Sequence, residues 1–259
     1  MDRTAKVRMD HGQPEDLPSW EIRPGVRFPD WAAIRSPNAE LALKDIFALL
    51  NIERFWDNYG GTEDLLRRTI LLEFAGNGRA PTPAELAGKA RLPEGQARET
   101  LKHLHDRDLI VFDADQDRIL GAYPFTEGDT EHKVRFGASS VNAMCAVDAL
   151  GAGAMYARDI TIDSRCRACG APIRATTRNE GTKLSQYSPQ SAIVWTGLRY
   201  ADNCAATSLC TVMAFFCSDT HLEEWRAANH PKIQGHRLSM EEAHELGIGI
   251  FGPMIRTAS

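Results

Sequence analysis

The fold of the first half of this chain is decided by residues 62–123, which read TEDLLRRTILLEFAGNGRAPTPAELAGKARLPEGQARETLKHLHDRDLIVFDADQDRILGAY. Three apolar patterns of helical spacing follow one another here, and Thr82 with Glu85 has the spacing of a capping box at the start of the second. Two strand-like runs, 109–112 and 119–123, come next on either side of a polar turn. Three helices followed by a hairpin are the order of a winged helix.

The charge of this region argues against nucleic acid as a partner. Residues 61–135 hold 11 Lys and Arg against 14 Asp and Glu, a difference of −3, and the turn between the two strands carries three aspartates. A phosphate backbone would be repelled by such a surface. We therefore expect a scaffold that packs on the rest of the chain, with a winged-helix regulator as the alternative.

The whole chain has the composition of an ordinary globular protein. Its 259 residues are 43% hydrophobic and 25% charged, and 30 Lys and Arg against 35 Asp and Glu give a net charge of −5. No apolar run approaches the ~20 residues that a membrane helix needs, and the polar start of the chain lacks the apolar core of a secretory signal. We expect a cytoplasmic protein without membrane contact.

The sequence divides into three regions. Residues 1–60 form an N-terminal extension, with a proline-rich arm over 1–38 and an apolar helical pattern over 39–57. Residues 61–133 form the winged-helix-like domain, and residues 134–259 contain short strands, loops and all six cysteines. We expect an α+β fold in which the winged-helix-like half packs on a half of small antiparallel sheets with flanking helices.

Cys145 and Asp148 lie in a stretch that we predict to be a helix capped by Ser139 and Ser140. A spacing of three places the thiol and the carboxyl on one face of that helix, where both can address the same small site. The alternative is a buried thiol that only packs, beside a solvated acid, because free cysteine is among the most buried residue types.

Cys210 lies at the start of residues 211–216, a run that has the apolar character of a buried strand. Alternation along this strand points Cys217 away from the side that Cys210 faces. Cys204 lies in the loop upstream and can reach either side. Packing in the core is again the alternative for these three thiols.

Cys166-Arg-Ala-Cys169-Gly170 has the form of a zinc knuckle, whose tight turn lets two thiolates hold one metal ion. A structural zinc site needs four ligands, and the sequence shows no second C-x-x-C or H-x-x-x-H. Structural zinc at Cys166 and Cys169, with Cys204 as a candidate further ligand, is therefore one hypothesis. A turn with buried thiols and no metal is the other.

Four motifs in a fixed order give the chain a resemblance to a known family. They are CAVDAL at 145–150, CRACGAP at 166–172, CTVMAFFCS at 210–218 and EEAHELG at 241–247. With these motifs the chain resembles the bacterial organomercurial (alkylmercury) lyases over about Leu65 to Gly249. The resemblance marks residues 134–259 as an alkylmercury-lyase-like catalytic domain.

The resemblance implies an enzyme that cleaves a carbon–mercury bond by protonolysis, giving hydrocarbon and Hg(II). Cys145 and Cys210 match the two cysteines that bind mercury in the family, and Asp148 matches its proton shuttle. The resemblance implies no required cofactor, because mercury is part of the substrate and product. It implies an organomercurial small molecule as substrate, and thiols or mercuric reductase as acceptors of Hg(II).

The chemistry of these residue types agrees with that role. Mercury(II) is a soft cation that prefers thiolate ligands, and two thiolates raise the electron density on the mercury–carbon bond. A carboxyl group beside them can collect a thiol proton and deliver it to the leaving carbon. The alternative on the same residues is a relative that holds zinc or copper(I) without turnover.

Overall fold

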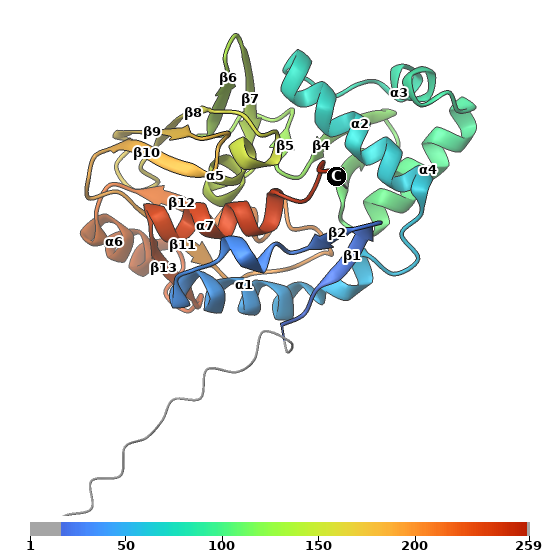
Figure 1. The fold of residues 1–259 in the computed structure, drawn as a ribbon. Coiled ribbons are helices and arrows are strands. Elements are labelled where there is room, and N and C mark those ends of the chain that lie inside the picture. Colours follow the sequence, from blue (N-terminus) through green and yellow to red (C-terminus); the bar gives the residue numbers. More distant parts are fainter. Residues whose placement is uncertain (1–16, 258–259) are drawn as a thin grey trace, which may run out of the picture.

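The computed structural model describes residues 17–257 (Figure 1). The first 16 residues of the expected arm lie outside this range. From Trp20 the arm forms structure of its own, namely a hairpin of β1 (Trp20–Arg23) and β2 (Val26–Phe28), a 3-10 turn at Trp31–Ala33, helix α1 (Pro37–Leu50) and a 3-10 turn at Ile52–Phe55. Asn51 ends α1 in the left-handed region, with φ of 49°, so the helical pattern expected over 39–57 is interrupted there.

This N-terminal segment, residues 17–60, packs on the last helix of the chain, α7 (Met240–Phe251). The Asp30 N–H donates to the Gly249 carbonyl at 2.9 Å, and a Cβ on Gly249 would meet the side chain of Ile34 at 2.7 Å. In Figure 1 the blue elements β2 and α1 lie beside the red α7. The segment is therefore part of the core.

The helices and hairpin expected over 62–123 are present in the expected order. They are α2 (Gly61–Asn77), α3 (Pro83–Ala90), α4 (Glu94–Asp106), β3 (Ile110–Asp113) and β4 (Arg118–Ala122). The capping box is formed, because Thr82 Oγ1 accepts from the Glu85 N–H at 3.2 Å and a Glu85 carboxylate oxygen accepts from the Thr82 N–H at 2.8 Å. Local capping chemistry thus fixes the start of α3.

One antiparallel sheet of eight strands crosses the residue 133/134 boundary. Its order is β10-β9-β8-β6-β7-β5-β4-β3, and the strands beyond the β3–β4 hairpin are β5 (Phe125–Thr126), β6 (Lys133–Phe136), β7 (Ser139–Ala143), β8 (Thr161–Arg165), β9 (Pro172–Arg178) and β10 (Lys183–Ser188). The prediction that Ser139 and Ser140 cap a helix is wrong. They begin β7 and pair with β6, because Val141 and Ala143 alternate into the core from this strand.

A second sheet of three strands has the order β12-β11-β13, with β11 (Ile193–Gly197), β12 (Met213–Phe216) and β13 (Gly235–Ser239). Helices α5 (Ala146–Met155), α6 (Asp219–Asn229) and α7 accompany the two sheets. Helices α5 and α7 touch backbone to backbone, since a Cβ on Gly151 would lie 2.4 Å from the Gly247 carbonyl oxygen. The α+β fold class is confirmed.

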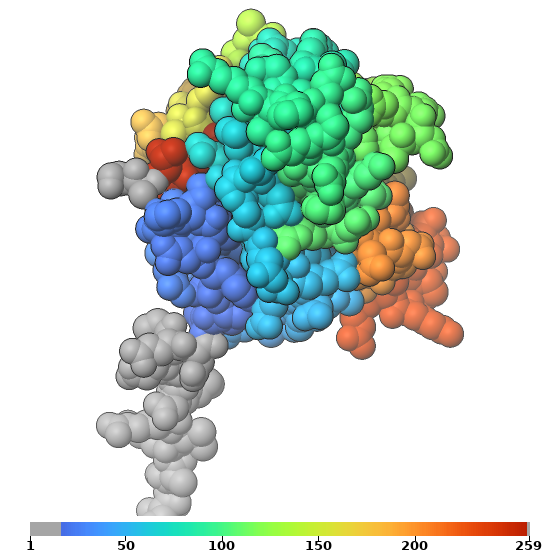
Figure 2. All heavy atoms as spheres, turned by 90° about the vertical axis from the view of Figure 1, so that its right-hand side faces the viewer, coloured from blue at the N-terminus to red at the C-terminus, as the bar shows by residue number. Residues whose placement is uncertain are grey.

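Figure 2 shows the face where the N-terminal segment (blue) meets the helical half (cyan to green), with the loop before β12 (orange) at its side. Residues from all three line one internal cavity. Among residues 17–257 no helix is long and apolar enough to cross a bilayer.

Candidate active site

Cys145 is the N-cap residue of α5, one position before the helix begins. Its extended backbone, with φ of −149°, carries the chain out of β7 and into the helix. The Asp148 N–H donates to Cys145 Sγ at 3.5 Å, so the thiol caps the helix that carries the carboxyl. The two side chains come together through this cap. The expectation that both residues lie inside the helix is wrong for Cys145, which lies one position before its start.

Cys210 reaches the same site from a different part of the chain. It begins a 3-10 turn at Cys210–Val212, and its N–H donates to the Ala205 carbonyl at 2.8 Å. The strand expected over 211–216 starts only at Met213, so strand alternation does not orient Cys210. The turn points its sulfur to 3.8 Å from Asp148 Oδ2.

The three groups form one compact, buried cluster. One ligand atom from each of Cys145, Asp148 and Cys210 lies within 4.8 Å of the other two. All three residues are at most 5% exposed. Two soft sulfur donors and one oxygen donor thus converge from sequence positions that are 62 residues apart.

Burial controls the protonation of this cluster. It raises the pKa of Asp148 from 3.8 to about 7, because the charged carboxylate loses its hydration. Burial also raises the pKa of the Cys145 thiol, while the contact with Cys145 and burial together raise the pKa of Cys210 well above its usual range. At neutral pH the carboxyl can therefore both accept and release a proton, as a shuttle requires.

An apolar cavity of about 100 Å³ opens on this cluster. Cys145, Asp148, Cys210 and Met213 are among the residues that line it. Residues of the N-terminal segment also line it, and they are Phe28, Ile46, Phe47, Leu50, Ile52, Phe55 and Trp56. The extension that the sequence left without a function thus builds a wall of the cavity.

Comparison with known proteins identifies the family. A profile of alkylmercury lyases matches residues 125–252, which carry all three residues of the cluster. The alkylmercury lyases of Bacillus cereus and Streptomyces lividans are 28% and 27% identical to the chain over 177 residues, which cover 68% of this chain and 77% and 78% of those proteins. A crystal structure of the mercury-bound form of MerB2 superposes with a TM-score of 0.67 at 28% identity and covers 83% of this chain and 99% of MerB2. The chain belongs to the alkylmercury lyase family.

Membership in the alkylmercury lyase family makes this protein a lyase directed at carbon–mercury bonds. The matched region begins at Phe125 in β5 and ends at Gly252, just after α7. The N-terminal segment lies before it and packs on α7 inside the matched region. The cavity wall described above is therefore contributed in part by residues outside the family profile.

Asp108 is a residue of this alkylmercury lyase that the sequence did not single out. It is 3% exposed, lines the cavity, and accepts hydrogen bonds from Tyr123 Oη at 2.5 Å, Tyr200 Oη at 3.1 Å and the Ala205 N–H at 2.8 Å. Burial raises its pKa. Ala205 in turn accepts a hydrogen bond from the Cys210 N–H through its carbonyl. Asp108 therefore anchors the loop that presents Cys210. An aspartate just before an apolar strand run was the only local signal.

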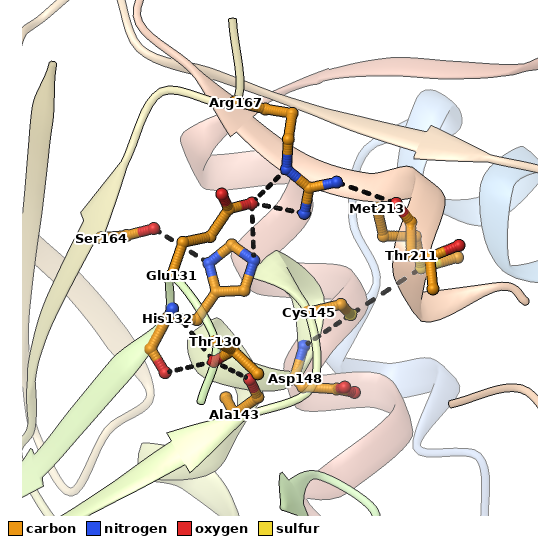
Figure 3. Close-up of polar contacts among 10 residues, drawn as sticks. All are labelled: Thr130, Glu131, His132, Ala143, Cys145, Asp148, Ser164, Arg167, Thr211 and Met213. Atoms are coloured by element: carbon orange, nitrogen blue, oxygen red, sulfur yellow. Dashed lines mark hydrogen bonds and ion pairs between the residues drawn. The ribbon is translucent and has the colours of Figure 1, made fainter. Parts of the chain in front are cut away.

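A second polar network, built around Arg167, Glu131 and His132, lies near Cys145 and Asp148 (Figure 3). Arg167 pairs with Glu131 and donates to the Thr211 carbonyl at 2.9 Å, next to Cys210. The buried His132 shares a 2.9 Å hydrogen bond with Ser164 Oγ, and burial lowers its pKa to about 3, so the ring is neutral. These contacts tie the 3-10 turn of Cys210 to the long sheet.

The remaining cysteines lie elsewhere in this member of the family. Cys204 is half-buried, and over the described residues it joins no cluster of metal-binding side chains, so the structure does not support it as a further ligand beside Cys166 and Cys169. Cys217 instead lies beside Cys169, with the two sulfurs 3.7 Å apart. Cys217 thus belongs to a different group of metal-binding side chains from Cys145, Asp148 and Cys210.

Proposed function

We propose that this protein is an organomercurial lyase in which Cys145 and Cys210 bind the mercury of R–Hg⁺ and Asp148 moves the proton that releases R–H. The convergence of two buried thiols and one buried carboxyl in the lining of an apolar cavity carries this proposal. The thiols suit a soft metal, and the cavity suits the hydrocarbon group.

The proton balance of the reaction follows from these groups. One thiol exchanges with the thiolate that accompanies R–Hg⁺ in solution, which releases an external thiol and leaves a sulfur–mercury bond. The second thiol gives its proton to the Asp148 carboxylate, 3.8 Å from Cys210 Sγ, and its sulfur joins the mercury. Asp148 then delivers that proton to the carbon as the mercury–carbon bond breaks. Hydrocarbon leaves, and Hg(II) remains on two thiolates.

The raised pKa of Asp148 supports the shuttle role. An aspartate with an ordinary pKa near 3.8 would hold a proton too weakly to carry it to carbon at neutral pH. With a pKa of about 7 the same carboxyl is present in both forms. The low polarity that causes this shift also keeps competing water away from the bond that breaks.

The size and lining of the cavity suggest the substrate range. About 100 Å³ bounded by Phe28, Phe47 and Trp56 suits a small alkyl group, and because an apolar cavity of ~150 Å³ accommodates benzene, a phenyl group requires this wall to move outward. We propose methylmercury and phenylmercury as representative substrates. Released Hg(II) passes to external thiols or to a mercuric reductase. All six cysteines are free thiols, which agrees with a protein that functions in the reducing cytoplasm.

The test is product analysis with matched variants. The full chain is incubated with phenylmercury and excess thiol, and benzene is measured by gas chromatography. We expect benzene from the wild type and from Cys204→Ser, background levels from Cys145→Ser and Cys210→Ser, and mercury binding without benzene from Asp148→Asn. Stoichiometric mercury binding without benzene from the wild type would overturn the proposal in favour of a metal-holding relative.

A further inference from the structure

A second cluster of metal-binding side chains lies apart from the cavity. Cys166, Cys169, Cys217 and His221 each offer one ligand atom, and the four atoms all lie within 4.8 Å of one another. Cys166 and Cys169 lie in the turn between β8 and β9, Cys217 follows β12, and His221 lies in the first turn of α6. We propose that these four residues bind one structural zinc ion.

The distances match a tetrahedral site. Sulfur atoms at ~2.3 Å from a tetrahedral zinc ion lie ~3.8 Å apart. Cys169 Sγ and Cys217 Sγ are 3.7 Å apart, and Cys166 Sγ is 3.8 Å from His221 Nδ1. The 2.8 Å between Cys217 Sγ and His221 Nδ1 is a thiol–imidazole hydrogen bond, whose proton zinc displaces.

The turn that carries Cys166 and Cys169 is built to present both sulfurs. Gly170 has φ of 72°, which the residue after the second cysteine can adopt without strain because it is glycine. The Gly170 N–H donates to the Cys166 carbonyl at 2.8 Å and closes the turn. From the facing element the Cys217 N–H donates to Cys166 Sγ at 3.4 Å, which favours the thiolate form that a metal requires.

The donor set selects the metal. Three thiolates and one imidazole in tetrahedral arrangement suit zinc, whereas calcium and magnesium require oxygen ligands. Four protein ligands leave no open position, so the site is structural rather than catalytic. Cys145, Asp148 and Cys210 form a separate group with only three ligands, which keeps mercury chemistry and zinc binding on different residues.

The position of the cluster gives zinc a specific structural role. The β8–β9 turn belongs to the eight-stranded sheet, and Cys217 directly follows β12 of the three-stranded sheet, so zinc clamps the two sheets together. Arg167 lies inside the turn, and its N–H donates to the Phe215 carbonyl at 3.0 Å while its guanidinium holds the Thr211 carbonyl. The β8–β9 turn thus holds both β12, through Phe215, and the 3-10 turn before it, through Thr211.

Metal content of the full chain tests the site without reference to mercury turnover. The protein is expressed with zinc, dialysed against metal-free buffer with a reductant, and analysed by mass spectrometry for metals. We expect about one zinc ion per chain in the wild type and in the double variant Cys145→Ser/Cys210→Ser, because the clamp does not use the catalytic thiols. Cys169→Ser and His221→Ala should hold less than a tenth of that amount.

Two further measurements guard against misfolded variants and against a disulfide. Cys169 is exposed, so Cys169→Ser should retain the wild-type circular dichroism while losing zinc, and its melting temperature should no longer fall on addition of a chelator. Cobalt(II) in place of zinc should give the visible bands of a tetrahedral thiolate site in the wild type and not in His221→Ala. A metal-free wild type, zinc that is lost with Cys145 and Cys210 instead, or a disulfide between Cys169 and Cys217 found by thiol titration would each overturn the proposal.

Discussion

Replacing Asp148 by asparagine should change how the stability of the protein depends on pH. Asp148 is 4% exposed, and burial raises its pKa from 3.8 to about 7. A pKa that is higher in the folded than in the unfolded state means that the folded protein holds the proton more tightly. Its contribution to stability is therefore fully present below about pH 4 and is lost as the pH rises through about 7. Asparagine carries no titrating proton, so the variant does not show this loss.

The magnitude follows from the difference between the two pKa values. The span from 3.8 to about 7 corresponds to about 4 kcal/mol at 1.36 kcal/mol per pH unit. The unfolded chain has already released most of its proton by pH 5, which accounts for about a third of the total. Between pH 5 and pH 8 the wild type should lose about 3 kcal/mol more of its free energy of unfolding than Asp148→Asn.

Urea denaturation at several pH values between 5 and 8, with a reductant and without mercury, measures this difference. Asp115→Asn is the matched control, because Asp115 is an exposed aspartate in the β3–β4 turn and its variant should follow the wild-type curve. Stability curves of wild type and Asp148→Asn that stay parallel across this range would refute the reasoning. The buried carboxyl would then be ionised in the folded state throughout, and it would lack the protonated form that a shuttle needs.

Three other perturbations test how the cavity and the turn of Cys210 are held. Phe47→Ala removes a buried ring from the cavity wall and should lower the free energy of unfolding by ~3–5 kcal/mol in urea denaturation; a loss below 1 kcal/mol would mean that the wall is loosely packed. Tyr123→Phe removes a hydrogen bond to the buried Asp108 and should cost ~1–3 kcal/mol, measured in the same way, and unchanged stability would contradict the anchoring role. Arg167→Gln breaks the bond to the Thr211 carbonyl and should slow benzene release while zinc content stays at the wild-type level; an unchanged rate would show that the turn needs no such support.

Much of the local structure follows from interactions within a few residues. Thr82 and Glu85 satisfy each other's backbone N–H groups, so their spacing alone predicts the start of α3. The order of three helices and a hairpin over 62–123 was predicted for the same reason. The spacing of Cys145 and Asp148 also predicted that a thiol and a carboxyl meet, although the contact is a helix cap and not a shared helix face.

Predictions failed where a distant partner decides the local structure. Ser139 and Ser140 have good capping side chains, but pairing with β6 makes this stretch a strand. Cys210 precedes an apolar run that resembles one strand, but its bond to Ala205 and the contacts of Asp108 with that loop wind the start of the run into a 3-10 turn. Neither partner can be read from local periodicity, because both meet the segment only after the chain has folded.

The cysteines show the same division between sequence and tertiary structure. The sequence by itself determined the family, the residue types that bind a soft metal, and a knuckle-like turn at Cys166 and Cys169. Only the tertiary structure decided which residues share a site: Cys210 joins Asp148 across 62 residues, and Cys217 with His221 joins the knuckle. The physical reason is that each site is closed by packing between two sheets, and the alignment of two sheets depends on the whole core rather than on the spacing within any one motif.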